Sequence, residues 1–170
     1  MTHNGLKKIG APSLEELKNS SAFPQNEDFM NGPIAVIECI EEIPCNPCET
    51  SCPKGSITIG KPITNLPRID FKKCSGCGIC VAACPGLAIY IKDYTFSEEK
   101  ALITFPFEYV PLPEIGDIVT LVDRQGQDVC PGIVTKINKA KAFNQTALIT
   151  VKYSKEYFEN VISMKRKIII

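Results

Sequence analysis

The chain has 170 residues, of which 44% are hydrophobic and 22% are charged, as is typical of one ordinary globular domain or two small ones. Nineteen basic side chains balance nineteen acidic ones, so the near-zero net charge gives no support to nucleic-acid binding or to a general membrane-surface role. The apolar stretches are too short for a membrane span, and residues 1–20 lack the apolar core of a secretory signal, so we expect a cytoplasmic protein.

Residues 1–32 are predicted to form an N-terminal arm with little core of its own. Ser13, with Glu16 three residues later, has the pattern of a capping box, which predicts a short helix over about residues 13–20. Such a helix is as typical of an ordinary surface element as of an arm that docks on another protein.

Residues 33–92 are predicted to form a small α+β unit. Short strands are expected where β-branched residues follow breaks at Gly and Pro. The expected strands are 34–37, 56–59, 68–71 and 87–91. Two cysteine-rich loops follow the first and third of these strands, and each loop should end in a short helical turn before the next strand.

Residues 93–170 contain no cysteine run and are rich in β-branched residues separated by turns. The expected strands are 101–105, 117–122, 129–136 and 147–153. Residues 123–126 are predicted to form a hairpin turn, and Ser154 to cap a final helical turn over 154–159. This pattern predicts a small antiparallel barrel or sandwich, and of these we expect a small C-terminal antiparallel β-barrel-like domain. The three isoleucines at the end would be unusual in solvent, so we expect protein to cover them.

Eight of the nine cysteines lie in two runs. The second run has the spacing Cys-x2-Cys-x2-Cys-x3-Cys-Pro, the bacterial pattern for iron–sulfur ligands, and consists of Cys74, Cys77, Cys80 and Cys84. The first run consists of Cys39, Cys45, Cys48 and Cys52. It matches the second run from its second cysteine onward, but five residues instead of two separate its first two cysteines. Cys130 has no obvious co-ligand and is predicted to be a plain thiol.

Disulfides and zinc are the other common uses of clustered cysteines. An odd cysteine count, the absence of a secretory signal and tight Cys-x-x-Cys spacing argue against disulfides. Zinc ribbons pair two Cys-x-x-Cys knuckles across a longer gap, and they have no need of three thiols at steps of three followed by a fourth and a proline. Iron–sulfur clusters therefore account best for the pattern.

An internal repeat relates the two runs. A shift of 32 residues lays the last three cysteines and the proline of the first run onto those of the second, and it lays Ile57 onto Ile89. We expect the two halves to bury a shared core that neither could supply alone. The same register places Glu42 opposite the first cysteine of the second run, and Pro44 opposite Gly76.

On these residues, the region 33–92 resembles a bacterial-type two-cluster ferredoxin. The resemblance implies two [4Fe–4S] clusters, and it implies that the fourth cysteine of each run ligates the cluster of the other run. The implied ligands of cluster 1 are Cys39, Cys45, Cys48 and Cys84, and those of cluster 2 are Cys74, Cys77, Cys80 and Cys52. Three arrangements remain open at the irregular corner of cluster 1. Cys39 reaches in across a longer loop, Glu42 supplies an oxygen ligand, or the corner is vacant and the cluster has three irons.

The whole chain also resembles the two-cluster subunit of flavin-dependent amino-acid or amine dehydrogenases of anaerobes. The shared features are an N-terminal arm, Ile-Glu-Cys at 37–39, Ile-Pro-Cys-Asn-Pro-Cys-Glu at 43–49 and a small β-domain that follows. The resemblance implies a hetero-oligomer in which flavoprotein dehydrogenase subunits hold FAD or FMN, with a [2Fe–2S] subunit as a further candidate partner.

A cube with four thiolate ligands can accept and donate single electrons, but it has no open corner for a substrate. No nucleotide fingerprint, catalytic dyad or pair of carboxylates stands out elsewhere in the chain. The sequence therefore predicts a non-catalytic electron-transfer subunit of an oxidoreductase. The alternatives are a free-standing two-cluster ferredoxin, disfavoured by the neutral charge and about 110 extra residues, and an iron–sulfur redox sensor, disfavoured by two paired cubes.

Overall fold

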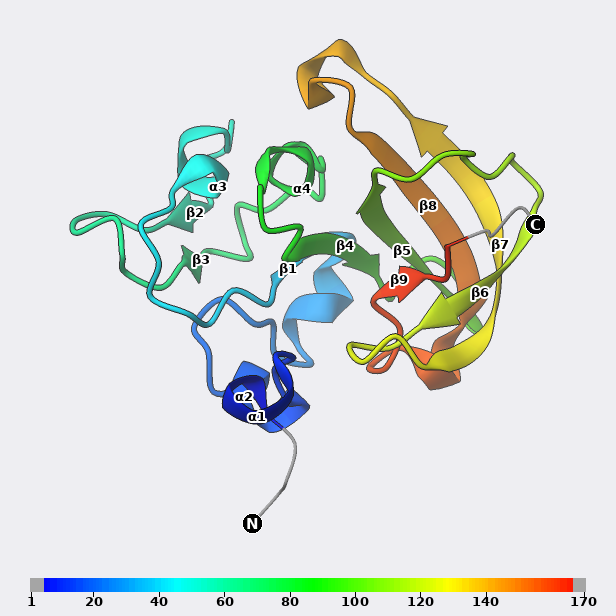
Figure 1. Cartoon of the computed structure of the whole chain (residues 1–170), viewed down its shortest axis with the longest axis horizontal. Coiled ribbons are helices and arrows are strands. Elements are labelled where there is room, and N and C mark those ends of the chain that lie inside the picture. Colours follow the sequence, from blue (N-terminus) through cyan, green and yellow to red (C-terminus); the bar gives the residue numbers. More distant parts are fainter. Residues whose placement is uncertain (1–4, 167–170) are drawn as a thin grey trace.

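One antiparallel sheet runs through both halves of the chain in the computed structural model, which describes residues 5–166 (Figure 1). Its seven strands follow the order β1-β4-β5-β8-β7-β6-β9, and β2 and β3 form a separate two-stranded ribbon. The strands are β1 (Ile34–Ile37), β2 (Ile57–Thr58), β3 (Arg68–Ile69), β4 (Ile89–Asp93), β5 (Lys100–Phe107), β6 (Ile118–Val122), β7 (Asp128–Asn138), β8 (Ala147–Ser154) and β9 (Ser163–Met164). Each range predicted as a strand overlaps one of these.

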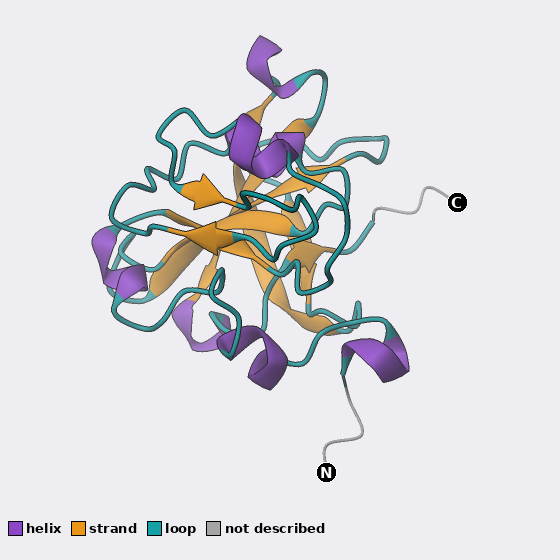
Figure 2. Ribbon diagram, turned by 90° about the vertical axis from the view of Figure 1, so that its left-hand side faces the viewer, coloured by secondary structure: helices purple, strands orange, loops and turns teal. Residues whose placement is uncertain are grey.

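The helices are short and lie around the strands (Figure 2). They are α1 (Leu6–Ile9), α2 (Leu14–Lys18), η1 (Asp28–Asn31), α3 (Pro47–Thr50), α4 (Ile79–Ala83), η2 (Lys141–Phe143) and η3 (Lys155–Tyr157), where η marks a 3-10 turn. None of the helices in the described part of the chain combines the length and the apolar character needed to cross a membrane.

The N-terminal arm packs onto the body of the molecule. The predicted capping box is present, because the Ser13 hydroxyl accepts the Glu16 N–H at 3.2 Å while the Glu16 carboxylate accepts the Ser13 N–H at 2.7 Å. The next turn of α2 carries Leu17, which is fully buried in the larger apolar core. The helix is therefore held by the rest of the fold.

The C-terminal strands form the larger part of this open sheet, so the prediction that they close into a β-barrel is wrong. β4 pairs with β5, with Ile91 opposite Thr104, and the described sheet ends at β1 and β9 without closing. In Figure 1, β1 and β4 lie between the cysteine-bearing region and strands β5–β9. Alternation of buried and exposed residues along a strand is the same in a barrel and in an open sheet, so the pattern could not distinguish them.

Three other expectations concern boundaries and the C-terminal end. The division into units 1–32, 33–92 and 93–170 stays a prediction, and its second boundary falls within β4. The turn expected over 154–159 is present as η3, but the Ser154 hydroxyl donates to Glu156 instead of capping a backbone N–H. The three terminal isoleucines lie outside the described residues.

Two apolar cores connect the halves. The larger lies against β5–β8 and includes Phe105 and Tyr153. The smaller surrounds the cysteine region, and it joins Val81 of α4 to Phe143 and Leu148 from the C-terminal half. The cysteine region is thus partly covered by residues more than fifty positions away in the sequence.

Lys92 is buried at the junction, with 3% of its surface exposed. Its ammonium group donates a hydrogen bond to the Phe158 carbonyl and lies 4.7 Å from the centre of the Phe158 ring. Burial, reinforced by the nearby Arg124 cation, lowers the pKa of Lys92 to about 7. The period-2 pattern of a strand gives no sign that a lysine would be taken into the interior.

Candidate iron–sulfur centres

The second cysteine run is shaped by two glycines in the left-handed region. Gly76 has φ +62° and lies so close to Pro33 that a Cβ atom would stand 2.6 Å from the Pro33 carbonyl oxygen. Gly78 has φ +81° and immediately precedes α4, which carries Cys80. Only glycine adopts such backbone angles without strain, so these positions let a tight loop end directly in a helix.

The first run reaches its helix without a glycine and begins that helix with a proline. Pro47 is the first residue of α3, where a proline is favoured because its missing N–H would have no partner in the helix. Cys45 precedes it and donates its N–H to the Ile63 carbonyl at 3.2 Å. Between Glu38 and Cys45 the chain has no regular structure, so the longer spacing that precedes Cys45 forms a loop.

The eight thiols gather around two cavities, each lined by three cysteines of one run and one cysteine of the other. Cavity 1 is lined by Cys39, Cys45, Cys48 and Cys84, and cavity 2 by Cys52, Cys74, Cys77 and Cys80. These two sets of four cysteines are the ligand sets that the resemblance to two-cluster ferredoxins implies. That they ligate iron stays a prediction.

Isoleucines that correspond in the sequence repeat line opposite cavities. Ile57 lines cavity 2 and its counterpart Ile89 lines cavity 1, whereas Ile59 lines cavity 1 and its counterpart Ile91 lines cavity 2. Ile89 and Ile91 are successive residues on one face of β4, a spacing of roughly 7 Å. The two cavities are therefore immediate neighbours along this strand.

Cys39 lies at cavity 1, whereas Glu42 does not. Cys39 is partly buried and lines the cavity, while Glu42 is exposed and is not part of its lining. Burial, and after it the nearby thiols of Cys84 and Cys45, raise the pKa of Cys39. This placement favours Cys39 over the carboxylate as the fourth ligand of cluster 1.

The crowded thiols need a positive group to become thiolates. Burial, followed by the proximity of Cys84, raises the pKa of Cys48 to about 11. Burial, followed by the proximity of Cys74, raises the pKa of Cys80 to about 12. Thiolates are the form that binds metal, so the positive irons of a cluster would supply the compensation that the protein alone does not.

The donor set at each cavity includes four cysteine thiols, and thiolates are the soft ligands that hold iron–sulfur clusters. Within residues 5–166, no three Cys, His, Asp or Glu side chains converge on one position where a metal ion could bind. The donor set fits a cube.

Backbone N–H groups point at sulfurs of cavity 2. The Ala35 N–H donates to Cys74 Sγ at 3.4 Å, and the Ser56 N–H donates to Cys52 Sγ at 3.3 Å. Although burial opposes ionisation, backbone N–H groups led by that of Ser56 hold the pKa of Cys52 below its usual value. Such hydrogen bonds stabilise negative charge on sulfur and are one way in which proteins adjust cluster potentials.

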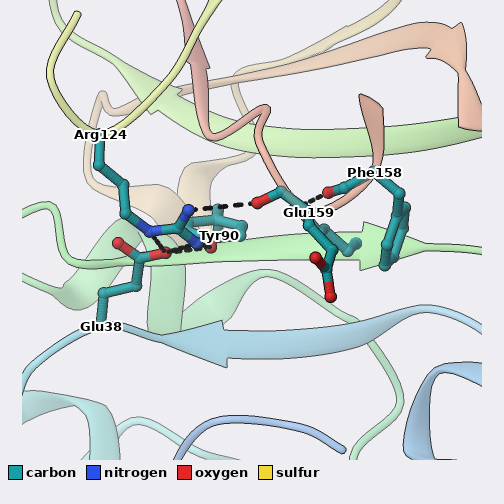
Figure 3. A network of polar contacts seen from close by, with 6 residues as sticks. Glu38, Tyr90, Arg124, Phe158 and Glu159 are labelled. Atoms are coloured by element: carbon teal, nitrogen blue, oxygen red, sulfur yellow. Dashed lines mark hydrogen bonds and ion pairs between the residues drawn. The ribbon is translucent and has the colours of Figure 1, made fainter. Parts of the chain in front are cut away.

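A polar network beside cavity 1 joins the two halves of the chain (Figure 3). Glu38, next to Cys39, accepts hydrogen bonds from Arg124 in the β6–β7 turn and from the Tyr90 hydroxyl. Sequence patterns did not predict this network. An acidic residue at the end of an apolar strand was the only local signal, and nothing in the turn sequence indicates that Arg124 points inward.

Comparison with known proteins supports the iron–sulfur assignment. Residues 67–90, which contain the second run, match the family of 4Fe-4S binding domains. The first run lies outside the matched residues, so the match does not confirm the number of clusters. No solved structure is significantly similar to the chain.

Three relatives are similar to part of the chain. A component of an ion-translocating oxidoreductase complex from Methanosarcina acetivorans, named as one of its subunits, is 44% identical over 50 residues, covering 29% of this chain and 18% of the relative. The isethionate sulfite-lyase activating enzyme of Desulfovibrio desulfuricans is 44% identical over 57 residues, covering 32% and 18%. The polyferredoxin-like subunit of aliphatic sulfonate oxidoreductase from Pyrococcus furiosus is 33% identical over 75 residues, covering 44% and 38%.

The chain thus spans between 18% and 38% of the length of these relatives. Together with the family match and the gathered thiols, they support iron–sulfur binding and electron transfer by this chain.

Proposed function

We propose that this protein relays single electrons through two [4Fe–4S] clusters as a non-catalytic subunit of a flavin-dependent oxidoreductase of the amino-acid or amine dehydrogenase type. The observation that carries the proposal is the crossed grouping of eight thiols around two neighbouring cavities. Two adjoining cubes, each with four thiolate ligands, form a conductor and leave no iron free to bind a substrate.

Each cluster would accept one electron and pass it on, and the chain would supply ligands, spacing and water exclusion. Cavity 1 is walled by isoleucines and prolines, among them Ile37, Ile59 and Pro47, which keep water from the sulfurs. Cavity 2 has an exposed ligand in Cys77 and therefore offers the closer approach from the surface. The exposed Cys77 makes cluster 2 the centre that a redox partner would reach through its ligand.

The proposal places the chain in a hetero-oligomer. Two of the relatives are named as subunits of oxidoreductases. The C-terminal half exposes large apolar side chains, with Val110 78%, Ile118 77% and Ile115 67% accessible, more than a free electron carrier needs. The flavin partner itself rests on the resemblance to dehydrogenase subunits described above.

The test is purification of the native protein without oxygen, followed by counting iron, sulfide and flavin. We expect about eight irons and eight sulfides per chain, and bound flavin in the same complex. The reduced protein should show two magnetically interacting spins, because the cavities are neighbours. A Cys130→Ser variant is the matched control and should keep every iron, since Cys130 lines neither cavity.

Other results would contradict parts of the proposal. About four irons per chain would leave one cluster, and zinc in place of iron would overturn the ligand assignment. About eight irons without flavin, in a chain that purifies alone, would indicate a free electron carrier.

A further inference from the structure

We propose that Arg124 is a positioning residue for cluster 1, which holds the irregular ligand Cys39 at cavity 1 through a buried ion pair with Glu38. The inference rests on the proposed function, because it concerns a ligand of one of the two clusters. It also gives the C-terminal half a role at cavity 1, although all four cysteines of that cavity belong to the N-terminal half.

Glu38 is fixed directly beside the ligand. Its N–H donates to the Ala88 carbonyl at 2.9 Å, which extends the β1–β4 ladder by one residue. The next residue is Cys39, and the chain then loses regular structure until α3. The last firmly held point before the loop is therefore Glu38.

Arg124 reaches Glu38 from the opposite half of the molecule. Its Nη2 and Nε atoms donate to the same Glu38 carboxylate oxygen at 2.6 and 2.9 Å, and its Nη1 donates to the Glu159 carbonyl at 3.1 Å. The Tyr90 hydroxyl donates to that carboxylate oxygen as well. In Figure 3 the guanidinium lies between Glu38 and the segment of Glu159.

Burial makes this pair different from the ion pairs at the surface. The side chains of Arg124 and Glu38 are 11% and 9% exposed, whereas those of Lys165 and Asp128 are 57% and 55% exposed. Without Arg124 the Glu38 carboxylate would keep the Tyr90 hydroxyl as a donor but lose its compensating cation, which favours turning toward water. Because Cys39 is the adjacent residue, that movement would displace its thiol from cavity 1.

The second run shows why cluster 1 needs such help. Its leading cysteine, Cys74, is held by the Ala35 N–H on its sulfur and by a loop in which Gly76 packs against Pro33. Cys39 is separated from Cys45 by a longer loop, and the backbone N–H at its sulfur, that of Glu41, belongs to that same loop. The ion pair of Glu38 and Arg124 instead ties this end of the loop to the C-terminal half.

The experiment compares Arg124→Ala, Arg124→Lys and Lys165→Ala in the protein purified without oxygen. Arg124→Ala should lose about one iron of eight and show the spectrum of a three-iron cluster when oxidised, while the signal of cluster 2 remains. Arg124→Lys keeps the charge with fewer hydrogen bonds, so it should retain more of the missing iron. Lys165→Ala removes an exposed ion pair at β7 and should keep all eight.

The outcomes separate this inference from the proposed function. If wild-type protein does not hold two clusters, the proposed function fails. If wild type and Arg124→Ala both hold eight irons with the same spectra, only the positioning role fails. Equal loss of both clusters in Arg124→Ala and Arg124→Lys would also contradict it, since Arg124 would then support the fold in general.

Discussion

Replacing Cys52 with alanine is expected to remove cluster 2 and to leave cluster 1 in place, although Cys52 belongs to the first cysteine run. Its thiol lines cavity 2 together with Cys74, Cys77 and Cys80. Without the Cys52 thiol, one iron of that cube has no protein ligand. The cube is also open to solvent near Cys77, which is exposed. We therefore expect the iron content to fall from about eight toward about four per chain.

Comparison among cysteine variants identifies which cluster is lost. The spectrum of reduced Cys52→Ala should match that of Cys77→Ala, whose residue belongs to the other run, and should differ from that of Cys48→Ala. Cys84→Ala should match Cys48→Ala by the same reasoning. If Cys52→Ala instead matches Cys48→Ala, each run ligates its own cluster and the crossed assignment is wrong. Cys130→Ser again controls for loss of a buried thiol.

Gly76→Ala should destabilise the protein by about 2 to 5 kcal/mol and release cluster 2 more readily. The left-handed backbone costs an alanine about 1–2 kcal/mol. The added methyl group would stand 2.6 Å from the Pro33 carbonyl oxygen, and relieving that overlap costs about 1–3 kcal/mol more. The rigid neighbour is backbone, so it cannot swing aside as a flexible side chain would.

Gly86→Ala is the matched control, because Gly86 also lies beside a cysteine run. Its Cβ would meet nothing within 4 Å, and its φ is not in the left-handed region. Thermal unfolding under anaerobic conditions should therefore show a clearly lower Tm for Gly76→Ala and little change for Gly86→Ala. Equal Tm values for the two variants would show that the loop at Gly76 is loose enough to adjust.

The sequence predicted the parts of this structure that depend on local patterns. Alternation and turn residues located β1 to β8 but not the two-residue β9, and Ser13 with Glu16 located α2. Cysteine spacing selected the candidate ligands. Their division between two cavities came from the resemblance to ferredoxins, because spacing along the chain does not say which thiols meet across it.

What the sequence did not predict depends on contacts between distant segments. The pairing of β4 with β5 turns two expected units into one sheet, and no local pattern distinguishes that pairing from a closed barrel. Arg124 occupies a turn, where arginines usually point into water, yet its side chain is 11% exposed because Glu38 lies within reach. Lys92 likewise occupies a strand position whose burial is determined by Phe158.

The continuous sheet also joins the cysteine region to strands that follow residue 92. A chain cut after residue 92 would present the N–H and C=O groups of β4 that now bond to β5 as an open edge, a template for aggregation. It would also uncover Val81, which now packs in one core with Phe143 and Leu148. Shortening this protein to a minimal electron carrier would therefore require redesign of that edge.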